Sequence, residues 1–490
     1  MIKRIGLTVG LIAPLIILIF ADFGENEQTN KMAAIAVMMS VFWVTEAIPL
    51  AATALLPLTL FPLLGIASSK ATASQYMNST VFLLIGGFMI ALAMQKWNLH
   101  KRIALNILGV FGAHPFQLIL GFMLATAGLS MWISNTASTL MMLPIALAII
   151  SRYEKFLSAE QVHRFTVGLL LSIAYSASIG GMMTLVGTAP NLVFASFYQR
   201  INDVSIGFSQ WMMLAVPIGM SMLIVLSGMI KLFYLRGLPS VSDLKQVVVE
   251  EKKQLGKITN AEKSVLVVFM MTASLWMTRK GIDIGVFNFM GWSHYLSFGK
   301  MIDDGSVAIA MATVLFFIPA TSENGEKTSI LDQTVFPQLP WSIVLLFGGG
   351  FALAFGFSES GLSAYLAGQL QGLKSVSLPI IILTVSAGMN LLTELTSNTA
   401  TTQLVMPILL STAKVIGISP MWLMLPAVLS ASCAFMLPVA TPPNAIIFGS
   451  GKIKVFEMVK IGIMLNIIGV IMISLTCYWM MPLFIGQMNN

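Results

Sequence analysis

The sequence predicts an all-α integral membrane protein with about 11 transmembrane helices and two re-entrant helical hairpins, arranged as an inverted repeat. Three observations lead to this prediction. Of the 490 residues, 57% are hydrophobic and only 10% are charged, whereas a soluble domain carries roughly 25% charged residues. Uncharged apolar runs of spanning length recur along the chain, and a short polar motif is duplicated inside two apolar segments.

The duplicated motif is a tripeptide of small polar residues. Ser134-Asn135-Thr136 recurs as Ser397-Asn398-Thr399, and the prolines Pro144 and Pro407 follow in register. The shift between the copies is the same for the asparagines (398 − 135 = 263) and for the prolines (407 − 144 = 263). Small polar side chains are unfavourable in hydrocarbon unless they face protein or a cavity. The duplication therefore predicts an internal repeat that builds one polar site from two halves, as in secondary transporters.

Two further motifs are duplicated in the same order. Gly86-Gly87-Phe88 matches Gly349-Gly350-Phe351 with the same shift (349 − 86 = 263). The segment Gly187-Thr188-Ala189-Pro190-Asn191 matches Ala440-Thr441-Pro442-Pro443-Asn444 with a shift of 253 (440 − 187). The ten-residue difference falls in the loop 151–164, where insertions are tolerated. The repeat thus extends well beyond the tripeptides.

Apolar runs define the expected transmembrane helices. Spans are expected near residues 5–21, 32–48, 50–66, 80–95, 168–197, 210–235, 264–279, 305–320, 342–358, 420–449 and 461–485. Two other apolar segments, 115–150 and 376–415, carry a Ser-Asn-Thr tripeptide in the middle. Because these side chains compete for backbone hydrogen bonds, each segment is expected to form two short helices that meet at a polar tip within the membrane.

The charge distribution predicts the orientation. The formal net charge is +7, from 27 basic and 20 acidic residues. If the N-terminus is cytoplasmic and the C-terminus outside, most basic residues lie on the cytoplasmic side, above all in the loop 231–263, as the positive-inside rule requires. The positive charge therefore follows membrane topology, and no basic stripe suggests a nucleic-acid partner.

Equivalent loops of the two halves differ in charge. Lys96, Lys101 and Arg102 follow the first glycine pair, whereas the equivalent stretch 359–371 has no basic residue. This opposite bias predicts that the two halves lie upside down relative to each other. The loops that carry Lys101 and Lys374 are accordingly expected on opposite membrane faces.

The repeat also predicts a division of the chain into five segments. Residues 1–79 are expected to form N-terminal scaffold helices, and residues 461–490 a C-terminal helix. Residues 80–209 and 341–460 are expected to form the two transport segments, each with one hairpin and one broken helix. Residues 210–340 are expected to supply the scaffold helices of the second repeat, including the basic cytoplasmic loop.

The duplicated motifs favour binding of an anion together with a cation. Proline removes a backbone donor and restricts the preceding residue, so the two Pro-Asn motifs should break their helices. The N–H groups at the start of a broken helix carry positive partial charge suited to a carboxylate. Freed carbonyls, with Ser, Thr and Asn oxygens, can ligate Na⁺.

No Arg, Lys or His lies within the four motifs. A divalent anion bound there would have to be neutralised by helix ends and co-bound cations, because buried uncompensated charge is costly. We therefore expect Na⁺ as the coupling ion and no organic cofactor.

Four longer segments resemble the divalent anion:sodium symporter family, and the resemblance covers nearly the whole chain. These segments are Trp43–Pro49, Leu339–Gly350, Leu392–Thr399 and Ser432–Ile447. Members of that family carry succinate, malate, fumarate, citrate or sulfate. The resemblance implies import of a di- or tricarboxylate with Na⁺, a homodimer in the lipid of the bacterial inner membrane, and an elevator-like movement of a transport domain against a scaffold.

The resemblance also implies individual site residues. One Na⁺ site would comprise Ser130, Ser134, Asn135 and Gly187. A second would comprise Thr393, Thr396, Asn398 and Ala440. Gly187, Thr396 and Ala440 would act through their backbone carbonyls. The substrate would meet Asn135, Thr136, Thr188, Asn398, Thr399, Thr441 and Pro442. Ala189 departs from the pattern, because the second repeat has Pro442 at that position.

Alternatives remain beside this reading. A sodium-independent dicarboxylate exchanger or a sulfate carrier of the same fold would have similar motifs, and small neutral side chains do not measure the length between two carboxylates. Glu394 could couple a proton, but its repeat partner is Met131, which favours a structural or hydrogen-bonded role. A channel could use the same broken helices. An intramembrane enzyme is disfavoured, because no HExxH or Gly-x-Ser-x-Gly motif occurs and Cys433 has no histidine nearby in sequence.

Overall fold

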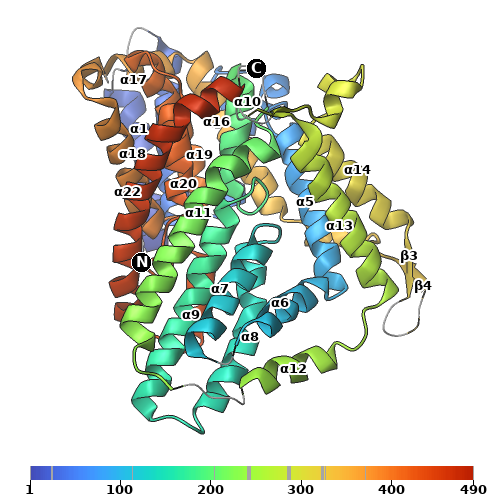
Figure 1. Cartoon of the computed structure of the whole chain (residues 1–490). Helices are drawn as coiled ribbons and strands as arrows, with labels where there is room; N and C mark the ends of the chain where they lie inside the picture. Colours follow the sequence, from blue (N-terminus) through green and yellow to red (C-terminus); the bar gives the residue numbers. More distant parts are fainter. Residues whose placement is uncertain are drawn as a thin grey trace.

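Figure 1 shows the fold as a computed structural model, which describes residues 2–21, 23, 26–112, 114–202, 205–239, 244–283, 288–321, 325, 327–369 and 371–488. Within these ranges the regular secondary structure is helical apart from two short pairs of strands. Nine helices of the described residues are long and apolar enough to cross a membrane. They cover Lys3–Phe20, Ser79–Lys96, Asn135–Tyr153, Ala159–Met182, Phe208–Leu235, Trp341–Glu359, Leu378–Leu395, Asn398–Ile416 and Val455–Pro482.

One group of helices comes from the N-terminal part and the middle of the chain. It comprises α1 (Ile2–Phe20), α2 (Glu27–Thr45), α3 (Leu50–Leu63), α4 (Ser69–Ala73), α5 (Ser79–Lys96), α6 (Leu99–Val110), α13 (Asn260–Arg279), α14 (Asp304–Phe317), α15 (Val335–Gln338), α16 (Trp341–Glu359) and α17 (Leu362–Gln369). In this group α1 packs on α2, α3 on α16, and α5 on α14. Helices α6 and α17 lie toward opposite ends of the molecule (Figure 1).

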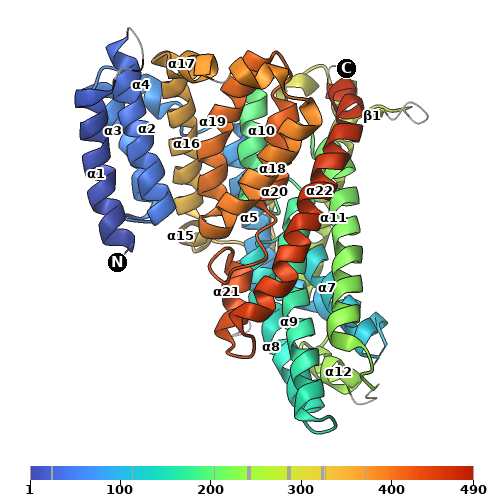
Figure 2. The same cartoon turned by 90° about the vertical axis from the view of Figure 1, so that its left-hand side faces the viewer.

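A second group contains both Ser-Asn-Thr tripeptides. It comprises α7 (Pro115–Ser130), α8 (Asn135–Tyr153), α9 (Ala159–Met182), α10 (Ala189–Asn202), α11 (Phe208–Ile230), α18 (Leu378–Leu395), α19 (Asn398–Ile416), α20 (Met421–Ala431), α21 (Pro442–Gly449) and α22 (Val455–Met488). Helix α9 packs against α7, α8 and α11, while α22 packs against α11, α18 and α20. Figure 2 shows α7, α8 and α9 in the lower half of the molecule and α18, α19 and α20 in the upper half.

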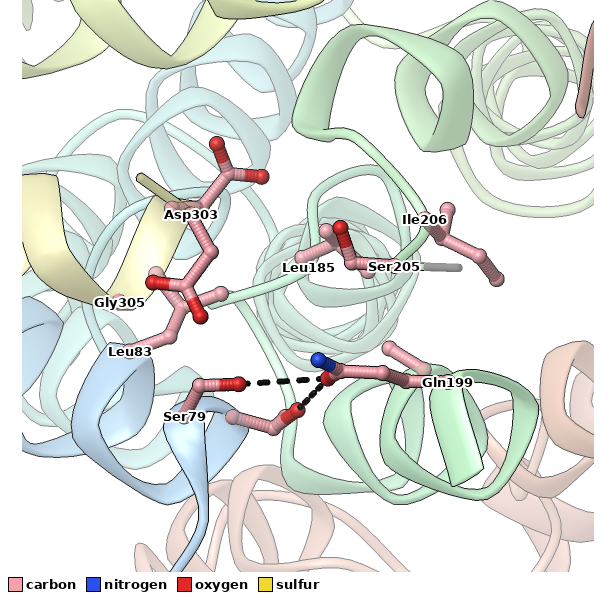
Figure 3. Close-up of a pocket in the computed structure, with 11 residues that line it drawn as sticks. Ser79, Leu83, Leu185, Gln199, Ser205, Ile206, Asp303 and Gly305 are labelled. Carbon is pink, nitrogen blue, oxygen red and sulfur yellow. Dashed lines mark hydrogen bonds between the residues drawn. The ribbon is translucent and has the colours of Figure 1, made fainter. Parts of the chain in front are cut away.

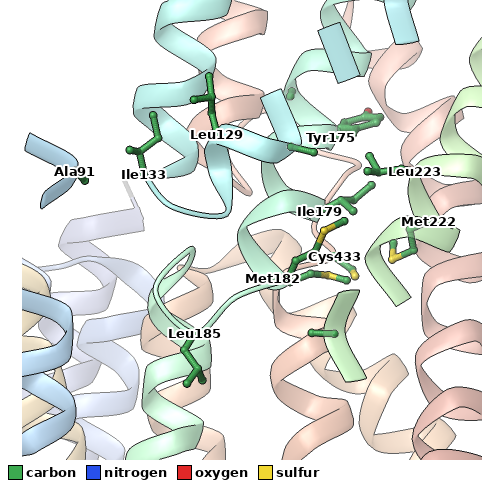
Figure 4. Packing of buried hydrophobic residues seen from close by; sticks show 14 of the residues in the cluster. Ala91, Leu129, Ile133, Tyr175, Ile179, Met182, Leu185, Met222, Leu223 and Cys433 are labelled. Atoms are coloured by element: carbon green, nitrogen blue, oxygen red, sulfur yellow. The ribbon is translucent and has the colours of Figure 1, made fainter. Parts of the chain in front are cut away.

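Most of the buried apolar side chains form one large cluster that joins the two repeats. Ile179 and Met182 of α9 lie beside Met222 and Leu223 of α11, and Cys433 of the second repeat joins them (Figure 4). A smaller cluster fills the space between α2, α3 and α16. The large cluster means that α9, α11 and the second-repeat helices are held together by continuous apolar packing.

Polar side chains determine where several helices begin. Asn26 accepts a hydrogen bond from the Gln28 N–H at 3.0 Å, and Glu27 pairs with Lys31 one turn later at 2.8 Å. This cap starts α2 at Glu27, before the expected span 32–48, because an N-cap satisfies an otherwise unpaired donor of the first turn. Asn78 caps α5 in the same way by accepting from the Val81 N–H at 3.1 Å.

Two antiparallel strand pairs add to the expected all-α fold, and both lie in loops. β1 (Ile282–Asp283) pairs with β2 (Asn288–Phe289), and β3 (Pro319–Thr321) pairs with β4 (Lys327–Ser329). Helix α14 ends at Phe317, before the end of the expected span 305–320, because Pro319 disfavours helix in the residue before it and opens β3. The chain also contains a short amphipathic segment, α12 (Leu244–Gln254), a π-helical turn, η1 (Lys231–Leu235), and the 3₁₀ turns η2 (Trp292–Tyr295), η3 (Gly299–Met301) and η4 (Gln371–Ser375).

The first glycine of each duplicated pair allows a close helix contact within the first group. A Cβ on Gly349 of α16 would lie 2.6 Å from the Cα of Ala54 in α3. A Cβ on Gly86 of α5 would lie 2.6 Å from the carbonyl carbon of Ala308 in α14. Both contacts involve backbone atoms, which cannot rotate away as a flexible side chain can. The duplicated glycines thus have a packing role that the sequence motif alone does not reveal.

Replacing Gly349 with alanine is therefore expected to destabilise the protein. Overpacking of a filled contact costs about 1–3 kcal/mol, so Gly349→Ala should lower the melting temperature of the detergent-purified protein. Gly388→Ala on α18 is the control, because a Cβ there meets no atom of the described residues within 4 Å. A Gly349→Ala protein that melts together with the Gly388→Ala protein would contradict this account of the contact.

Candidate functional site

The first tripeptide lies at the tip of a helical hairpin. Helix α7 ends at Ser130, and α8 begins at Asn135 with Ser134 as its N-cap. The Ser134 hydroxyl accepts from the Ala137 N–H at 3.2 Å. Ser130 donates its hydroxyl to the Asn135 side-chain oxygen at 2.6 Å, so the two sides of the tip are joined. The polar tripeptide therefore starts a helix instead of interrupting one, as the sequence predicted.

The first broken helix lies directly against this tip. Residues 183–188 separate α9 from α10. A Cβ on Gly181 would lie 2.3 Å from the Asn135 amide oxygen, and a Cβ on Gly187 would lie 2.9 Å from the Ser130 carbonyl oxygen. The Gly181 carbonyl oxygen is also within 2.4 Å of that Gly187 position. A side chain at position 187 would therefore collide with backbone oxygens, whereas one at position 181 would have to displace the Asn135 amide. Several oxygens converge at this point.

The second tripeptide forms an equivalent tip. Helix α18 ends at Leu395, and α19 begins at Asn398. The Thr393 hydroxyl lies 2.5 Å from the Asn398 side-chain oxygen and 3.0 Å from the Ala431 carbonyl oxygen. Thr396 donates to the Leu392 carbonyl at 2.7 Å. The Thr393–Asn398 pair is the counterpart of Ser130–Asn135, with both partners displaced by 263 residues (393 − 130 and 398 − 135).

The second broken helix follows the same plan. Residues 432–441 separate α20 from α21. Thr441 caps α21 by accepting from the Asn444 N–H at 3.4 Å. The Asn444 amide donates to the carbonyls of Ala434 at 3.1 Å and Leu437 at 3.0 Å. These contacts join the first turn of α21 to the earlier part of the break, and they fix the backbone around Ala440 and Thr441, which lies between.

The asparagine that ends each Pro-Asn motif is a residue that the sequence argument did not select. In the first repeat the Asn191 amide donates to the carbonyls of Gly181 at 3.2 Å and Thr184 at 2.7 Å. Each of these acceptors lies 253 residues before the acceptor of Asn444 (434 − 181 and 437 − 184). Both asparagines are fully buried, and within the described structure their side-chain oxygens have no hydrogen-bond partner. Their position at the end of both duplicated motifs was the available signal.

The two repeats cross over at the site. Helix α8, which begins at Asn135, packs against α21, which begins at Pro442. Helix α10, which begins at Ala189, packs against α19, which begins at Asn398. Each hairpin therefore contacts the broken helix of the other repeat as well as its own. This arrangement brings motifs from both halves of the chain into one region.

The predicted substrate residues differ in exposure. Asn135, Thr136, Thr188, Asn398 and Thr399 are all half-buried. Thr441 is buried, and Pro442 is exposed. Half-buried side chains at helix starts can reach a ligand while their backbones stay fixed by helical hydrogen bonds. The arrangement can thus offer helix N-termini to an anion and side-chain and carbonyl oxygens to a cation.

A small cavity lies elsewhere, where α10 meets the first group of helices. It has a volume of about 20 Å³, enough for roughly one water molecule. Figure 3 shows Ser79 of α5 donating to Gln199 of α10 in its wall, at 3.3 Å, with Asp303 and Gly305 opposite. The cavity contains none of the predicted site residues and is too small for a dicarboxylate. It marks the contact between the two helix groups.

The chain matches a known family over almost its whole length. The model for the sodium:sulfate symporter transmembrane region matches residues 3–485. The chain belongs to this family. It is therefore an integral membrane transporter and not an enzyme, and the resemblance to the divalent anion:sodium symporters noted in the sequence is confirmed.

Relatives within the symporter family include two staphylococcal proteins, both called "Sodium-dependent dicarboxylate transporter SdcS". The one from Staphylococcus aureus strain USA300 is 41% identical over 498 residues, which covers 99% of this chain and 92% of the relative. The one from Staphylococcus saprophyticus is 38% identical over 495 residues, with the same coverage.

One solved structure shares the symporter's fold at low sequence identity. The Alcanivorax borkumensis YdaH transporter superposes with a TM-score of 0.51 at 11% identity, over 92% of this chain and 98% of that chain. At this identity the likeness concerns the fold alone, and it supports the description of the protein as an all-helical membrane protein.

Proposed function

We propose that the protein is a secondary active carrier that imports dicarboxylates such as succinate, malate or fumarate together with Na⁺. The observation that carries the proposal is the pairing of the two repeats around four helix starts that contain no basic side chain. The names of the staphylococcal relatives, which are about 40% identical over the full length, support dicarboxylate and Na⁺ as the transported pair.

The proposed Na⁺ sites lie at the two hairpin tips. The first would use Ser130, Asn135 and the carbonyl of Gly187, and Ser134 would contribute from the N-cap position. The second would use Thr393, Asn398 and the carbonyls of Thr396 and Ala440. Their equivalent hydrogen bonds, Ser130 to Asn135 and Thr393 to Asn398, support two sites of the same construction. Binding of Na⁺ would replace these hydroxyl contacts with oxygen–cation contacts.

The proposed substrate site lies between those tips. Asn135, Thr136 and Thr188 would bind from one repeat, and Asn398 and Thr399 from the other, with Thr441 and Pro442 completing the second side. Each tip offers few hydrogen bonds, and removing two carboxylates from water without full replacement of their hydration is costly. Substrate binding therefore requires both halves, and the co-bound Na⁺ ions would offset the remaining negative charge.

We propose that the membrane topology comprises about 11 spans and two re-entrant hairpins in an inverted repeat. The opposite placement of α6 and α17 supports the inversion, and so does the placement of the two hairpins in opposite halves (Figures 1 and 2). Figure 2 marks the N-terminus at the lower end of α1 and the C-terminus at the upper end of α22. With the basic loop 231–263 on the cytoplasmic side, the N-terminus would be cytoplasmic and the C-terminus outside, in the bacterial inner membrane.

We further propose an elevator movement in a homodimer. The second group of helices, α7–α11 and α18–α22, would move against the first group. Helix α11 packs on α9 and α22, which favours its assignment to the moving part even though the repeat placed residues 210–340 with the scaffold. The boundary between the groups holds the small cavity and the contact between α16 and α19.

The test is uptake of radiolabelled succinate by proteoliposomes that contain the purified protein. Uptake should require an inward Na⁺ gradient, saturate with substrate, and be inhibited by unlabelled malate and fumarate. Inhibition by citrate would extend the substrate range to tricarboxylates. Exchange that proceeds without Na⁺, or uptake of sulfate but not succinate, would instead identify an exchanger or a sulfate carrier and contradict the proposal.

A further inference from the structure

Glu394 is a buried carboxylate that the proposed binding sites do not use. It follows Thr393 in α18, and only 3% of its surface is exposed. Its two oxygens accept from the backbone N–H of Met436 at 2.9 Å and of Leu437 at 3.0 Å. The Asn466 amide of α22 donates to it at 2.6 Å. A buried carboxylate is expensive unless it is fully hydrogen-bonded, so these contacts account for its presence.

Glu394 holds the break between α20 and α21, and the same break contains Ala440 of the proposed second Na⁺ site. Met436 and Leu437 belong to the break between α20 and α21, which ends at Ala440 and Thr441. Asn390, one turn before Glu394 on α18, donates to the Cys433 carbonyl in the same break. Helix α18 therefore carries both a proposed ligand, Thr393, and the groups that orient the backbone opposite it.

In the first repeat, the hairpin is joined to the helix break at the equivalent positions by a hydrogen bond that involves no charged group. Met131 is the repeat partner of Glu394 (394 − 131 = 263), and Thr184 is the partner of Leu437 (437 − 184 = 253). There the contact runs through the Thr184 hydroxyl, which donates to the Met131 carbonyl. The same hydroxyl accepts from the Gly187 N–H at 3.1 Å. Equivalent positions thus connect hairpin and break in both repeats, but only the second connection carries a negative charge.

We propose that Glu394 is a positioning residue for the second Na⁺ site, and that its charge makes this site bind Na⁺ more tightly than the first. The inference rests on the proposed function. The carboxylate holds residues 436 and 437, and the Ala440 N–H donates to the Leu437 carbonyl at 3.2 Å, so the backbone that carries the proposed ligand Ala440 is tied to Glu394. In an environment of low dielectric constant, a fixed negative charge close to a cation site also raises the cation affinity.

The hydrogen-bond geometry shows how Glu394 is held. All three partners that the described structure gives Glu394 are donors: the backbone N–H groups of Met436 and Leu437 and the side-chain amide of Asn466. The side chain therefore ties α18 both to the break between α20 and α21 and to α22, which is the arrangement that a positioning residue requires.

The experiment distinguishes two effects of Glu394: its negative charge, and the hydrogen bonds by which it holds residues 436 and 437. Glu394→Gln removes the charge and keeps the size of the side chain, but its NH₂ group cannot accept, so at least one of the three hydrogen bonds is lost as well. Glu394→Met with Leu437→Thr installs the first-repeat pair at the second repeat and offers a neutral attachment. Glu359→Gln, an exposed carboxylate on α16, is the matched control. Succinate uptake into proteoliposomes is measured against Na⁺ concentration, and Na⁺ binding to each purified protein is measured by calorimetry.

We expect Glu394→Gln to raise the Na⁺ concentration for half-maximal uptake about tenfold, which corresponds to about 1.4 kcal/mol. The maximal rate at saturating Na⁺ should change less. Glu394→Met alone should also lose maximal rate, and the added Leu437→Thr should restore the rate but not the Na⁺ affinity. Such restoration requires a correctly folded protein, so it distinguishes positioning from a general loss of structure.

Two results would overturn the inference while leaving the proposed function intact. One is a Glu394→Gln protein with wild-type Na⁺ dependence. The other is a Glu394→Gln protein whose uptake loses its response to pH but not to Na⁺, which would identify a proton carrier. Failure of the proposed function is recognised separately, because the wild-type protein itself would then show no Na⁺-dependent uptake.

Discussion

Asn135→Ala and Asn398→Ala should each reduce Na⁺-driven succinate uptake by roughly 10- to 100-fold, because each removes an oxygen from a buried cation. A hydrogen bond or contact to a charged group contributes about 1.5–3 kcal/mol, and each 1.4 kcal/mol is a factor of ten. Both asparagines also start a helix whose N–H groups are proposed to meet substrate. The loss should therefore appear in Na⁺ affinity and in substrate affinity together.

Initial rates of uptake in proteoliposomes, measured over a range of Na⁺ and succinate concentrations, test this expectation. Asn106→Ala is the control, because Asn106 lies exposed on α6 and outside the proposed site. Equal losses in the two variants are expected from the equivalence of Ser130–Asn135 and Thr393–Asn398. Wild-type rate and Na⁺ dependence in both variants would show that the Na⁺ sites are placed wrongly.

A disulfide between α16 and α19 should abolish uptake, because it would join the proposed scaffold to the moving hairpin. A Cβ on Gly350 would lie 2.9 Å from the Cβ of Gln403. A disulfide requires about 3.8 Å between the two Cβ atoms, so α16 and α19 must separate by about 0.9 Å as the bond forms. Gln403 is fully buried, and neither atom of its amide has a hydrogen-bond partner in the described structure. Gly350→Cys with Gln403→Cys therefore removes no visible hydrogen bond, and the smaller cysteine leaves room for the new side chain.

The measurement compares uptake before oxidation, after oxidation and after reduction of the same proteoliposomes. The native thiols of Cys433 and Cys477 are both buried and can remain in place. Gly168→Cys with Tyr234→Cys is the control, because a Cβ on Gly168 lies 3.2 Å from the Cβ of Tyr234. Gly168 lies on α9, and Tyr234 lies on η1, which continues α11, so both would move together. That pair should form a disulfide without arresting uptake. Full activity of the oxidised Gly350–Gln403 pair would rule out movement of α19 along α16, although Na⁺ coupling could still hold.

Several features of the site were predictable from the sequence. Ser134 and Asn135 have side chains that favour helix starts, so the tripeptide predicts a hairpin tip wherever it lies in an apolar segment. The proline after Thr441 predicts that a helix begins there, and α21 does begin at Pro442. These predictions succeed because capping and helix breaking depend on residues within a few positions of one another.

Other features depend on contacts between distant segments and were not predictable in this way. Asn191 and Asn444 could be seen as motif residues, but only the folded chain shows their bonds to the carbonyls of Gly181 and Ala434. The role of Gly349 depends on Ala54, which belongs to another helix far away in sequence. Short strand pairs such as β3–β4 lacked a periodic apolar pattern long enough to predict them.

By itself the sequence determined that this is a membrane transporter with a duplicated polar site. Hydropathy, composition and repeated motifs are properties of the sequence and do not depend on how distant segments pack. Only the tertiary structure decided which helices of the two repeats pack against each other. Helix α8 packs on α21 and α10 packs on α19, and the Glu394 carboxylate accepts from Met436, Leu437 and Asn466. The physical reason is that these contacts join segments from tens to hundreds of residues apart, and such pairings are selected by the packing of the whole chain and not by local preference.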